Sequence, residues 1–408
     1  MEKQKNAYII GTFDTKSEEL LYITDLLIKC GIETTLVDVS TSSDYQPETN
    51  ITVKPSDILQ FHPKKENLDE NSNDRGAAIA IMKESLVNFI RQTENIDGAI
   101  GAGGSGNTDL VSAALRELPI GIPKVIVSTV GSGNISPYVG PNDISMVYSV
   151  TDVAGLNSIS RKVLGNAAHS LAGMIANDIV IKKDNTPALG LTMFGVTTPC
   201  VDTLREKLSK TYDCLVFHAT GVGGQSMEKL AESNLLVGAI DVTTTEVCDL
   251  IAGGVFAANE DRFERLAKSG LPYVGSCGAL DMVNFGAIET VPEQYMNRNL
   301  YVHNANVTLM RTNNSECQKI GEFIARKLNL FHEPFSFLFP EKGFSLLDAE
   351  GQKFYDPEAN NTLLESLYAN ILPTHRHRII SLPLHINDPD FAEALIESWK
   401  NIVGEKND

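Results

Sequence analysis

The chain has 408 residues, which is enough for two or three domains with hydrophobic cores of their own. A formal net charge of −18 argues against partners that bind basic surfaces, such as nucleic acid or anionic membranes. No apolar run approaches the ~18 residues of a membrane span, and the first residues lack the apolar core of a signal peptide. We therefore expect a cytoplasmic protein that binds neither nucleic acid nor membrane.

Strands and helices alternate along the first half of the chain. Apolar runs predict strands at 7–10, 33–39, 96–100 and 124–130, and helical spacing predicts helices at 18–30, 76–92, 109–118 and 153–181. Such alternation requires parallel pairing, because each helix carries the chain back across the sheet. We predict a Rossmann-like, doubly wound domain at residues 1–183.

The first domain has glycine-rich or polar residues where its strands end. Gly101-x-Gly103-x-x-Gly106 follows one strand and precedes a helix, as in loops whose backbone amides cradle a phosphate. Lys16 follows the first strand, where its ammonium would neutralise phosphate charge. Asp38 ends the second strand and is placed to accept a hydrogen bond from a ribose hydroxyl, with solvation of the strand end as the alternative.

The second half repeats the pattern of the first. Strands are predicted at 188–196, 215–218, 235–241, 271–275 and 304–311, and helices at 197–208, 315–328 and 363–372. We predict a second α/β domain at residues 184–408. The whole chain is then an α/β protein of two Rossmann-like doubly wound domains with mostly parallel sheets.

A second ligand site is expected in the C-terminal domain. Another glycine-rich loop and a run of hydroxyls follow two of its strands, and this set comprises Thr220, Gly221, Gly223, Gly224, Thr243 and Thr244. Asp241 ends the strand after the loop, which keeps open an NAD-dependent oxidoreductase that uses Gly221, Gly223 and Asp241. The catalytic candidates are His218, Asp241, Glu246 and Cys277, with a cysteine nucleophile beside histidine as one alternative.

The six cysteines give no sign of a metal site. They form no C-x-x-C pair and have no metal-ligand spacing with histidine. We expect most of them to be small buried side chains, and we expect no protein metal site.

Long runs of sequence resemble a known family. They include Gly11-Thr12-Phe13-Asp14-Thr15-Lys16, Gly103-Gly104-Ser105-Gly106, Tyr148 to Asn157, Asp241 to Glu246 and His385-Ile386-Asn387-Asp388-Pro389. The chain is similar over nearly its whole length to uncharacterised bacterial and fungal proteins that match the ATP-binding N-terminal region of the tomato mosaic virus resistance protein.

The resemblance implies ATP with Mg²⁺ in the first domain, and a homodimer or higher homo-oligomer. The cofactor-binding residues that we expect are Gly11, Thr12, Asp14, Thr15, Lys16, Asp38, Gly103, Gly104, Ser105, Gly106, Asn107, Thr108, Thr129, Gly131 and Ser132. Family members usually have glycine where this chain has Asn107, and we expect Asn107 to donate a hydrogen bond to a phosphate.

The leading hypothesis is a nucleotide-binding protein with an unknown small molecule at its second site. It is either an enzyme of carbohydrate or organic-acid catabolism or a nucleotide-sensing regulatory protein without turnover. A dehydrogenase, a cysteine hydrolase and a pure interaction protein are the alternatives.

Overall fold

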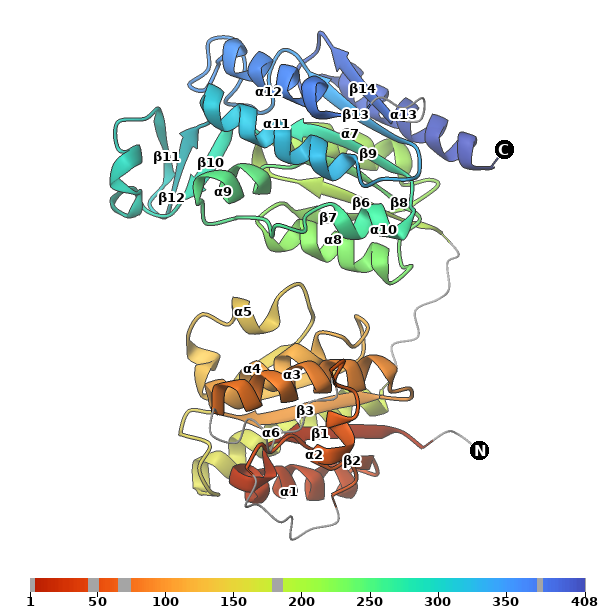
Figure 1. The fold of residues 1–408 in the computed structure, drawn as a ribbon, viewed down its shortest axis with the longest axis vertical. Coiled ribbons are helices and arrows are strands. Elements are labelled where there is room, and N and C mark those ends of the chain that lie inside the picture. The colour runs from red at the N-terminus through yellow and green to blue at the C-terminus, as the bar shows by residue number, and fades with distance from the viewer. Residues whose placement is uncertain (1–3, 43–50, 65–74, 178–185, 373–376, 408) are drawn as a thin grey trace. The chain divides into compact units, whose positions relative to one another are not determined.

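The computed structural model describes residues 4–42, 51–64, 75–177, 186–372 and 377–407 (Figure 1). It divides into two compact units, Met1–Lys182 and Lys183–Asp408. The expected boundary between residues 183 and 184 lies outside the described residues. None of the described helices is long and apolar enough to cross a membrane.

The N-terminal unit contains a five-stranded, fully parallel sheet in the order β2-β1-β3-β4-β5. Its strands are β1 (Asn6–Gly11), β2 (Glu33–Asp38), β3 (Gly98–Gly103), β4 (Lys124–Ser128) and β5 (Ser145–Tyr148). The order reverses direction between β1 and β3. In doubly wound sheets, ligands bind outside the carboxyl ends of the strands at this switch point.

Helices cover both faces of this sheet (Figure 1). They are α1 (Phe13–Lys29), α2 (Pro55–Leu59), α3 (Arg75–Gln92), α4 (Ser105–Leu115), α5 (Ser136–Val139) and α6 (Ser158–Ala176). Ile9 belongs to the core shared with α1 and α6, whereas its neighbour Ile10 belongs to the core shared with α3 and α4. Alternate strand residues point to opposite faces, so an apolar run on both faces needs a helix layer on each.

The C-terminal unit contains a six-stranded parallel sheet in the order β14-β13-β9-β8-β6-β7. Its strands are β6 (Ala188–Met193), β7 (Asp213–His218), β8 (Gly238–Thr243), β9 (Tyr273–Gly278), β13 (Phe335–Pro340) and β14 (His377–Leu382). A separate antiparallel sheet contains β10 (Met282–Phe285), β12 (Val307–Arg311) and β11 (Leu300–Asn304). The predicted fold of two doubly wound α/β domains is confirmed.

Two sets of helices enclose the C-terminal sheet. They are α7 (Thr198–Leu208), α8 (Val222–Glu232), α9 (Glu246–Ala252), α10 (Glu264–Ser269), α11 (Asn314–Leu328), α12 (Pro357–Asn370) and α13 (Pro389–Asn407). Phe337 and Leu338 are neighbours on β13, yet Phe337 packs with α11 and α12 and Leu338 packs with α7 and α13. The sheet therefore has a hydrophobic core on each side, as in the first unit.

Several predicted boundaries were wrong. β3 continues through Gly103 and α4 begins at Ser105, so the glycine-rich loop is much shorter than expected. The predicted strand 304–311 contains the last residue of β11, a tight turn and the whole of β12. The predicted helix 153–181 spans only Ser158–Ala176 within the described residues, and its last positions, 178–181, lie outside them.

A buried arginine joins three carboxylates at the carboxyl edge of the C-terminal sheet. Arg262 donates to Glu228 Oε1 at 2.7 Å, to Asp241 Oδ2 at 2.8 Å and to Glu246 Oε2 at 3.1 Å. The three acceptors come from α8, β8 and α9, and none of the four side chains is more than 3% exposed. Charges that have lost their water need such partners.

We predict that Arg262→Ala will lower the free energy of unfolding of the C-terminal unit by about 3–5 kcal/mol, because three buried carboxylates lose their counter-charge. Trp399 is the one tryptophan of the chain and is buried in this unit, so its fluorescence in a urea titration reports this unfolding.

Arg265→Ala is the matched control. Arg265 is partly exposed and lies 3.5 Å from Glu232, and such a pair contributes less than about 1 kcal/mol. Equal losses in the two variants would contradict the role assigned to Arg262.

Candidate functional site

A pocket of about 690 Å³ lies at the switch point between β1 and β3. Most of its lining comes from the residues that directly follow these two strands and β2. The lining residues are Thr12, Asp14, Thr15, Lys16, Val39, Thr41, Ser42, Ala78, Ile79, Gly104, Ser105, Gly106, Asn107, Leu110 and Asp152. Eight of the expected cofactor-binding residues thus lie in one pocket.

The first turn of α4 presents free backbone amides to this pocket. Gly104 is the N-cap residue of α4, and its carbonyl oxygen accepts a hydrogen bond from Thr108 N–H at 2.9 Å. Within the described part of the chain, no acceptor is found for the amides of Ser105, Gly106 and Asn107. Amides at a helix N-terminus bind anions through hydrogen bonds and the helix dipole.

The glycines near this turn have two different roles. A Cβ on Gly101 would lie 2.7 Å from Val111, and one on Gly103 would lie 2.9 Å from Asn107, so these two allow β3 and α4 to pack closely. Gly11 likewise packs against Leu20 of α1. A Cβ on Gly104 would meet only Thr129 Oγ1 at 3.9 Å, and one on Gly106 would meet nothing. Gly104 and Gly106 therefore leave space open beside the free amides.

The start of α1 contributes side chains to the pocket. Its own amides are already bonded: Lys16 N–H donates to Thr12 O, and Asp14 N–H donates to Ser40 Oγ at 3.0 Å. Thr12 and Thr15 share a hydrogen bond between their hydroxyls at 3.0 Å. Lys16 has non-helical backbone angles, φ −130° and ψ 19°, and lines the pocket as its cation.

Asp38 does not face the pocket, contrary to its predicted contact with a ribose. It is fully buried, and its Oδ1 accepts hydrogen bonds from Ser40 N, Ser40 Oγ and Phe13 N. Burial raises the pKa of its carboxyl, although the bonds from Ser40 oppose this. Asp38 therefore fixes the loop after β2 against the start of α1.

The side chain of Asn107 bonds back to the strand before its helix, and its predicted hydrogen bond to a phosphate stays a prediction. Its Nδ2 donates to Ala102 O at 2.8 Å, which turns Oδ1 the other way. Among the described residues, that Oδ1 has no hydrogen-bond partner, and the same holds for the buried oxygens Asp14 Oδ1 and Asp38 Oδ2. Asp14 and Asn107, which carry two of these acceptors, also line the pocket.

The turn after β4 supports the pocket from outside its lining. Thr129, Gly131 and Ser132 belong to a short 3₁₀ turn, and a Cβ on Gly131 would lie 2.9 Å from the backbone of Tyr148. Thr108 is buried, and its hydroxyl bonds to Ser128 Oγ at 2.6 Å. These predicted residues join β4, β5 and α4 and do not line the pocket.

The lining also includes residues that were not predicted as site residues. Asp152 is the only acid among them, and it follows β5, a strand that the sequence analysis missed. Thr41 and Ser42 continue the loop after β2. Val39, Ala78, Ile79 and Leu110 add an apolar portion, which no motif indicated.

The glycine-rich loop of the C-terminal unit already holds a carboxylate. Gly221 N–H and Gly224 N–H donate to Glu246 Oε1 at 2.8 and 3.0 Å. A Cβ on Gly224 would lie 2.2 Å from Glu246 Oε2, and one on Gly223 would lie 1.8 Å from His218 O. The amides that we expected to face a second ligand are occupied by the protein's own anion.

The hydroxyls of the expected second site also bond within the protein. Thr243 and Thr244 are fully buried, and their hydroxyls contact Thr197 Oγ1 at 2.8 Å and Ser276 O at 3.0 Å. Thr220 is partly exposed and donates to His218 O at 3.3 Å. The six residues therefore pack the sheet edge, and no described pocket contains them.

Of the catalytic candidates, Asp241 and Glu246 are joined through Arg262, whereas His218 and Cys277 lie in different surroundings. His218 is exposed and stacks on Phe194, with 5.3 Å between ring centroids. Cys277 lies in the hydrophobic core, where burial raises the pKa of its thiol well above the ordinary value. Asp241 is fully buried and accepts from Thr192 Oγ1 and Arg262, so it cannot reach a ribose. These findings do not favour the cysteine hydrolase or the dehydrogenase.

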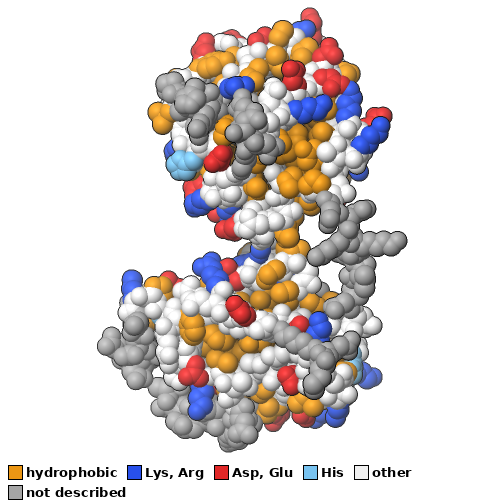
Figure 2. Space-filling model, turned by 90° about the vertical axis from the view of Figure 1, so that its right-hand side faces the viewer, with side chains coloured by type: hydrophobic (Ala, Val, Ile, Leu, Met, Phe, Trp, Pro, Cys, Tyr) orange, Lys and Arg blue, Asp and Glu red, His pale blue; other side chains and the backbone are white. Residues whose placement is uncertain are grey.

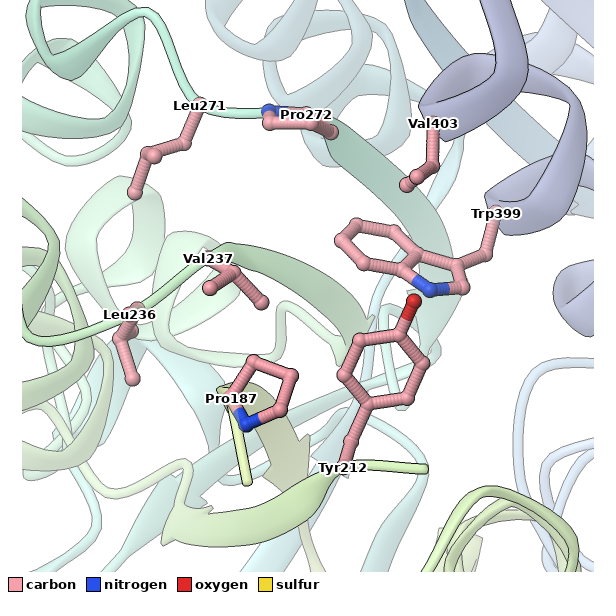
Figure 3. A pocket seen from close by; sticks show the side chains of 8 residues that line it. All are labelled: Pro187, Tyr212, Leu236, Val237, Leu271, Pro272, Trp399 and Val403. Atoms are coloured by element: carbon pink, nitrogen blue, oxygen red, sulfur yellow. The ribbon is translucent and has the colours of Figure 1, made fainter. Parts of the chain in front are cut away.

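A second described pocket, of about 390 Å³, lies in the C-terminal unit and is mainly apolar (Figure 3). It is lined by Pro187, Tyr212, Leu236, Val237, Leu271, Pro272, Trp399 and Val403. Most of these residues precede strands, so the pocket is at the amino edge of the sheet, opposite the edge that binds ligands in this fold. Hydrophobic patches are visible on the surface of both units in Figure 2.

Fold and pocket together define a doubly wound α/β protein with free helix-terminus amides at the switch point of its first sheet. The chain belongs to the uncharacterised protein family UPF0261. The model of the N-terminal domain of this family matches residues 5–179, and that of its C-terminal domain matches residues 186–403.

Relatives cover nearly the whole chain. A UPF0261 protein from Rhizobium meliloti is 51% identical over 399 residues, which are 98% of this chain and 99% of the relative. One from Clostridium tetani is 43% identical over 98% of this chain and 99% of the relative. The ToMV resistance protein Tm-1(GCR237) of Solanum lycopersicum is 43% identical over 97% of this chain, which spans 55% of the tomato protein. The predicted resemblance is confirmed, and the ATP site stays a prediction.

The C-terminal unit also contains a pair of buried carboxyls. Asp281 is fully buried after β9, and its Oδ2 accepts from Ser345 Oγ at 2.7 Å. Burial, together with the charge of Asp348, raises the pKa of Asp281 to about 7. In the unfolded chain this carboxyl titrates near its ordinary value of about 3.9. The folded state therefore holds the proton more tightly.

We predict that Asp281→Asn will flatten the pH dependence of stability. The contribution of Asp281 favours the folded state fully below about pH 4 and is lost as the pH rises through about 7. The asparagine variant should thus gain stability relative to the native chain between pH 4 and 8, measured by urea unfolding with Trp399 fluorescence. Glu397→Gln, at an exposed position of α13, is the control. A constant difference between Asp281→Asn and the native chain over this range would contradict the assignment.

Proposed function

We propose that the N-terminal unit binds a nucleoside phosphate, ATP with Mg²⁺, in the pocket between β1 and β3. The observation that carries this proposal is the combination, in one pocket, of free amides at the start of α4 with unpaired acceptor oxygens of Asp14 and Asn107. The amides suit an anion, and the oxygens suit a cation or hydroxyl groups. A magnesium nucleotide carries all of these groups.

The size and lining of the pocket support a nucleotide. Its volume of about 690 Å³ lies in the range of ~300–1,000 Å³ that is usual for small-molecule sites. Val39, Ile79 and Leu110 supply apolar contacts for a base, and Lys16 supplies positive charge for phosphates. The topology agrees, because mononucleotide ligands bind at the switch point of sheets with the order 2-1-3-4-5.

The acceptor oxygens fit a divalent cation. Mg²⁺ prefers oxygen ligands and is commonly held by one or two carboxylates together with phosphates and water. Asp14 and Asn107 would hold it on the protein side, with Asp152 as a further carboxylate in the same pocket. Within the described residues, no group of three or more His, Cys, Asp or Glu is placed to hold a metal ion. The phosphates would therefore complete the coordination, and the ion would neutralise their charge.

The proposed function is nucleotide binding. The bound nucleotide either regulates the protein or is a substrate in a reaction that the protein catalyses. The pocket lining includes neither histidine nor cysteine, and its ionisable groups are Asp14, Lys16 and Asp152. The tomato relative is named for resistance to ToMV, and we do not propose that activity for this chain. Release of inorganic phosphate from ATP distinguishes an enzyme from a sensor.

We predict that ATP with Mg²⁺ will raise the thermal unfolding temperature, and that Lys16→Ala with Gly104→Val will abolish the rise. A ligand at 100 times its Kd adds about 2.7 kcal/mol of stability. Valine fits at position 104 because a Cβ there meets only Thr129 Oγ1, so the ligand-free unfolding temperature should be unchanged. ADP, AMP and NAD are measured beside ATP.

Lys162→Ala with Gly173→Val is the matched control, because both positions are exposed on α6 and outside the pocket. This control should keep the full ATP response. An unchanged response in the Lys16 and Gly104 variant would place the site elsewhere.

Mg²⁺ should raise the affinity for ATP less in Asp14→Asn than in the native chain. We further predict that this gain in affinity will be smaller by about tenfold, or about 1.4 kcal/mol. The backbone bond from Asp14 N–H to Ser40 is kept, so the start of α1 should stay folded. Calorimetric titration of ATP at several Mg²⁺ concentrations measures the effect, with Asp25→Asn on the exposed side of α1 as the control. Equal Mg²⁺ dependence in both variants would remove Asp14 from the cation site.

A further inference from the structure

Cys30 differs from the other cysteines of the chain in its exposure. Cys200, Cys248, Cys277 and Cys317 are buried, Cys214 is partly buried, and Cys30 is exposed at the end of α1. Burial raises the pKa of the other five thiols, that of Cys200 to about 12. Since the thiolate is the nucleophile, those five are held in the unreactive form.

An imidazole lies directly beside the exposed thiol. Cys30 Sγ is 3.4 Å from His169 Nδ1, and His169 is itself exposed on α6. The two helices are fixed against each other by a shared core that includes Ile23, Leu27 and Ala168. The pair is thus held at hydrogen-bonding distance by two packed helices, with both groups open to solvent.

The reactivity proposed for Cys30 depends on the imidazole of His169. Cys30 is the C-cap of α1, so it does not lie at a helix N-terminus, the position that activates many reactive thiols. The neighbouring imidazole is the group that can take the thiol proton. Histidine near neutral pH accepts a proton from an adjacent thiol, as in other thiol–imidazole pairs.

We propose that Cys30 and His169 form a reactive pair, at which low-molecular-weight disulfides modify the chain. Cys30 Sγ attacks one sulfur of the disulfide, a new S–S bond forms, and the old S–S bond breaks. His169 Nδ1 takes the proton of Cys30, and the departing thiolate receives a proton to leave as a thiol. Cys30 is oxidised to a mixed disulfide, and the small disulfide is the oxidant.

This site is separate from the proposed nucleotide pocket. The pocket contacts the first turn of α1, and Cys30 follows its last turn. A helix of 17 residues is about 25 Å long, so the two sites lie at opposite ends of it. Nucleotide at saturating concentration should leave the reactivity of Cys30 unchanged.

The test is the reaction of the full native chain with an aromatic disulfide, 5,5′-dithiobis(2-nitrobenzoate), followed by the released thiolate. We expect one fast equivalent, assigned to Cys30 by peptide mass spectrometry and absent in Cys30→Ser. His169→Gln should slow it about tenfold at pH 7, since few unassisted thiols are ionised there. The two rates should converge at high pH, where free thiols in general are ionised without a base. His332→Gln, at another exposed histidine, should keep the native rate.

Two results would overturn the proposal. One is a fast equivalent that persists in Cys30→Ser, which would assign the reactivity to another thiol. The other is a His169→Gln rate that equals the native rate at pH 7, or that is slower by the same factor at every pH. Thermal unfolding of His169→Gln is measured in parallel, so that a loss of fold is recognised as such.

Discussion

The buried side chain of Arg262 is the interaction on which the C-terminal unit depends. It joins buried carboxylates from α8, β8 and α9. One of them, Glu246, follows β8 and accepts hydrogen bonds from the amides of Gly221 and Gly224, in the loop after the edge strand β7. In the first unit the free amides follow β3, a strand that borders the switch point.

Much of the fold could be predicted because buried parallel strands are apolar runs between amphipathic helices. The missed strands depart from this pattern. β5 has four residues at a sheet edge with no fully buried side chain, and β13 ends in Pro340, a residue that argues against a strand. The end of β3 was missed because glycine usually marks a turn, whereas Gly101 and Gly103 extend the strand beneath a closely packed helix.

The N-terminal pocket could be predicted in part, since its residues follow strands whose carboxyl ends share one edge. Which side chains face the pocket could not. Asp38 and Asp241 both end strands, but Ser40 bonds one and Arg262 the other, and these partners are a matter of three-dimensional packing. The bond from Asn107 Nδ2 to Ala102 O, which orients the amide group, is likewise a matter of packing. Asp152 was missed together with the strand that precedes it.

Glu246 also affects how the glycine-rich loop after β7 is interpreted. The glycines of the loop after β7 are required for packing alone, because a Cβ on Gly223 would meet His218 O and one on Gly224 would meet Glu246 and Arg262. The sequence pattern alone therefore does not distinguish this loop from the glycine-rich loop after β3. A shortened side chain at position 246 would leave two amides and a guanidinium facing a vacancy of carboxylate size. In this architecture, one substitution at position 246 would change a packed loop into a loop with free hydrogen-bond donors.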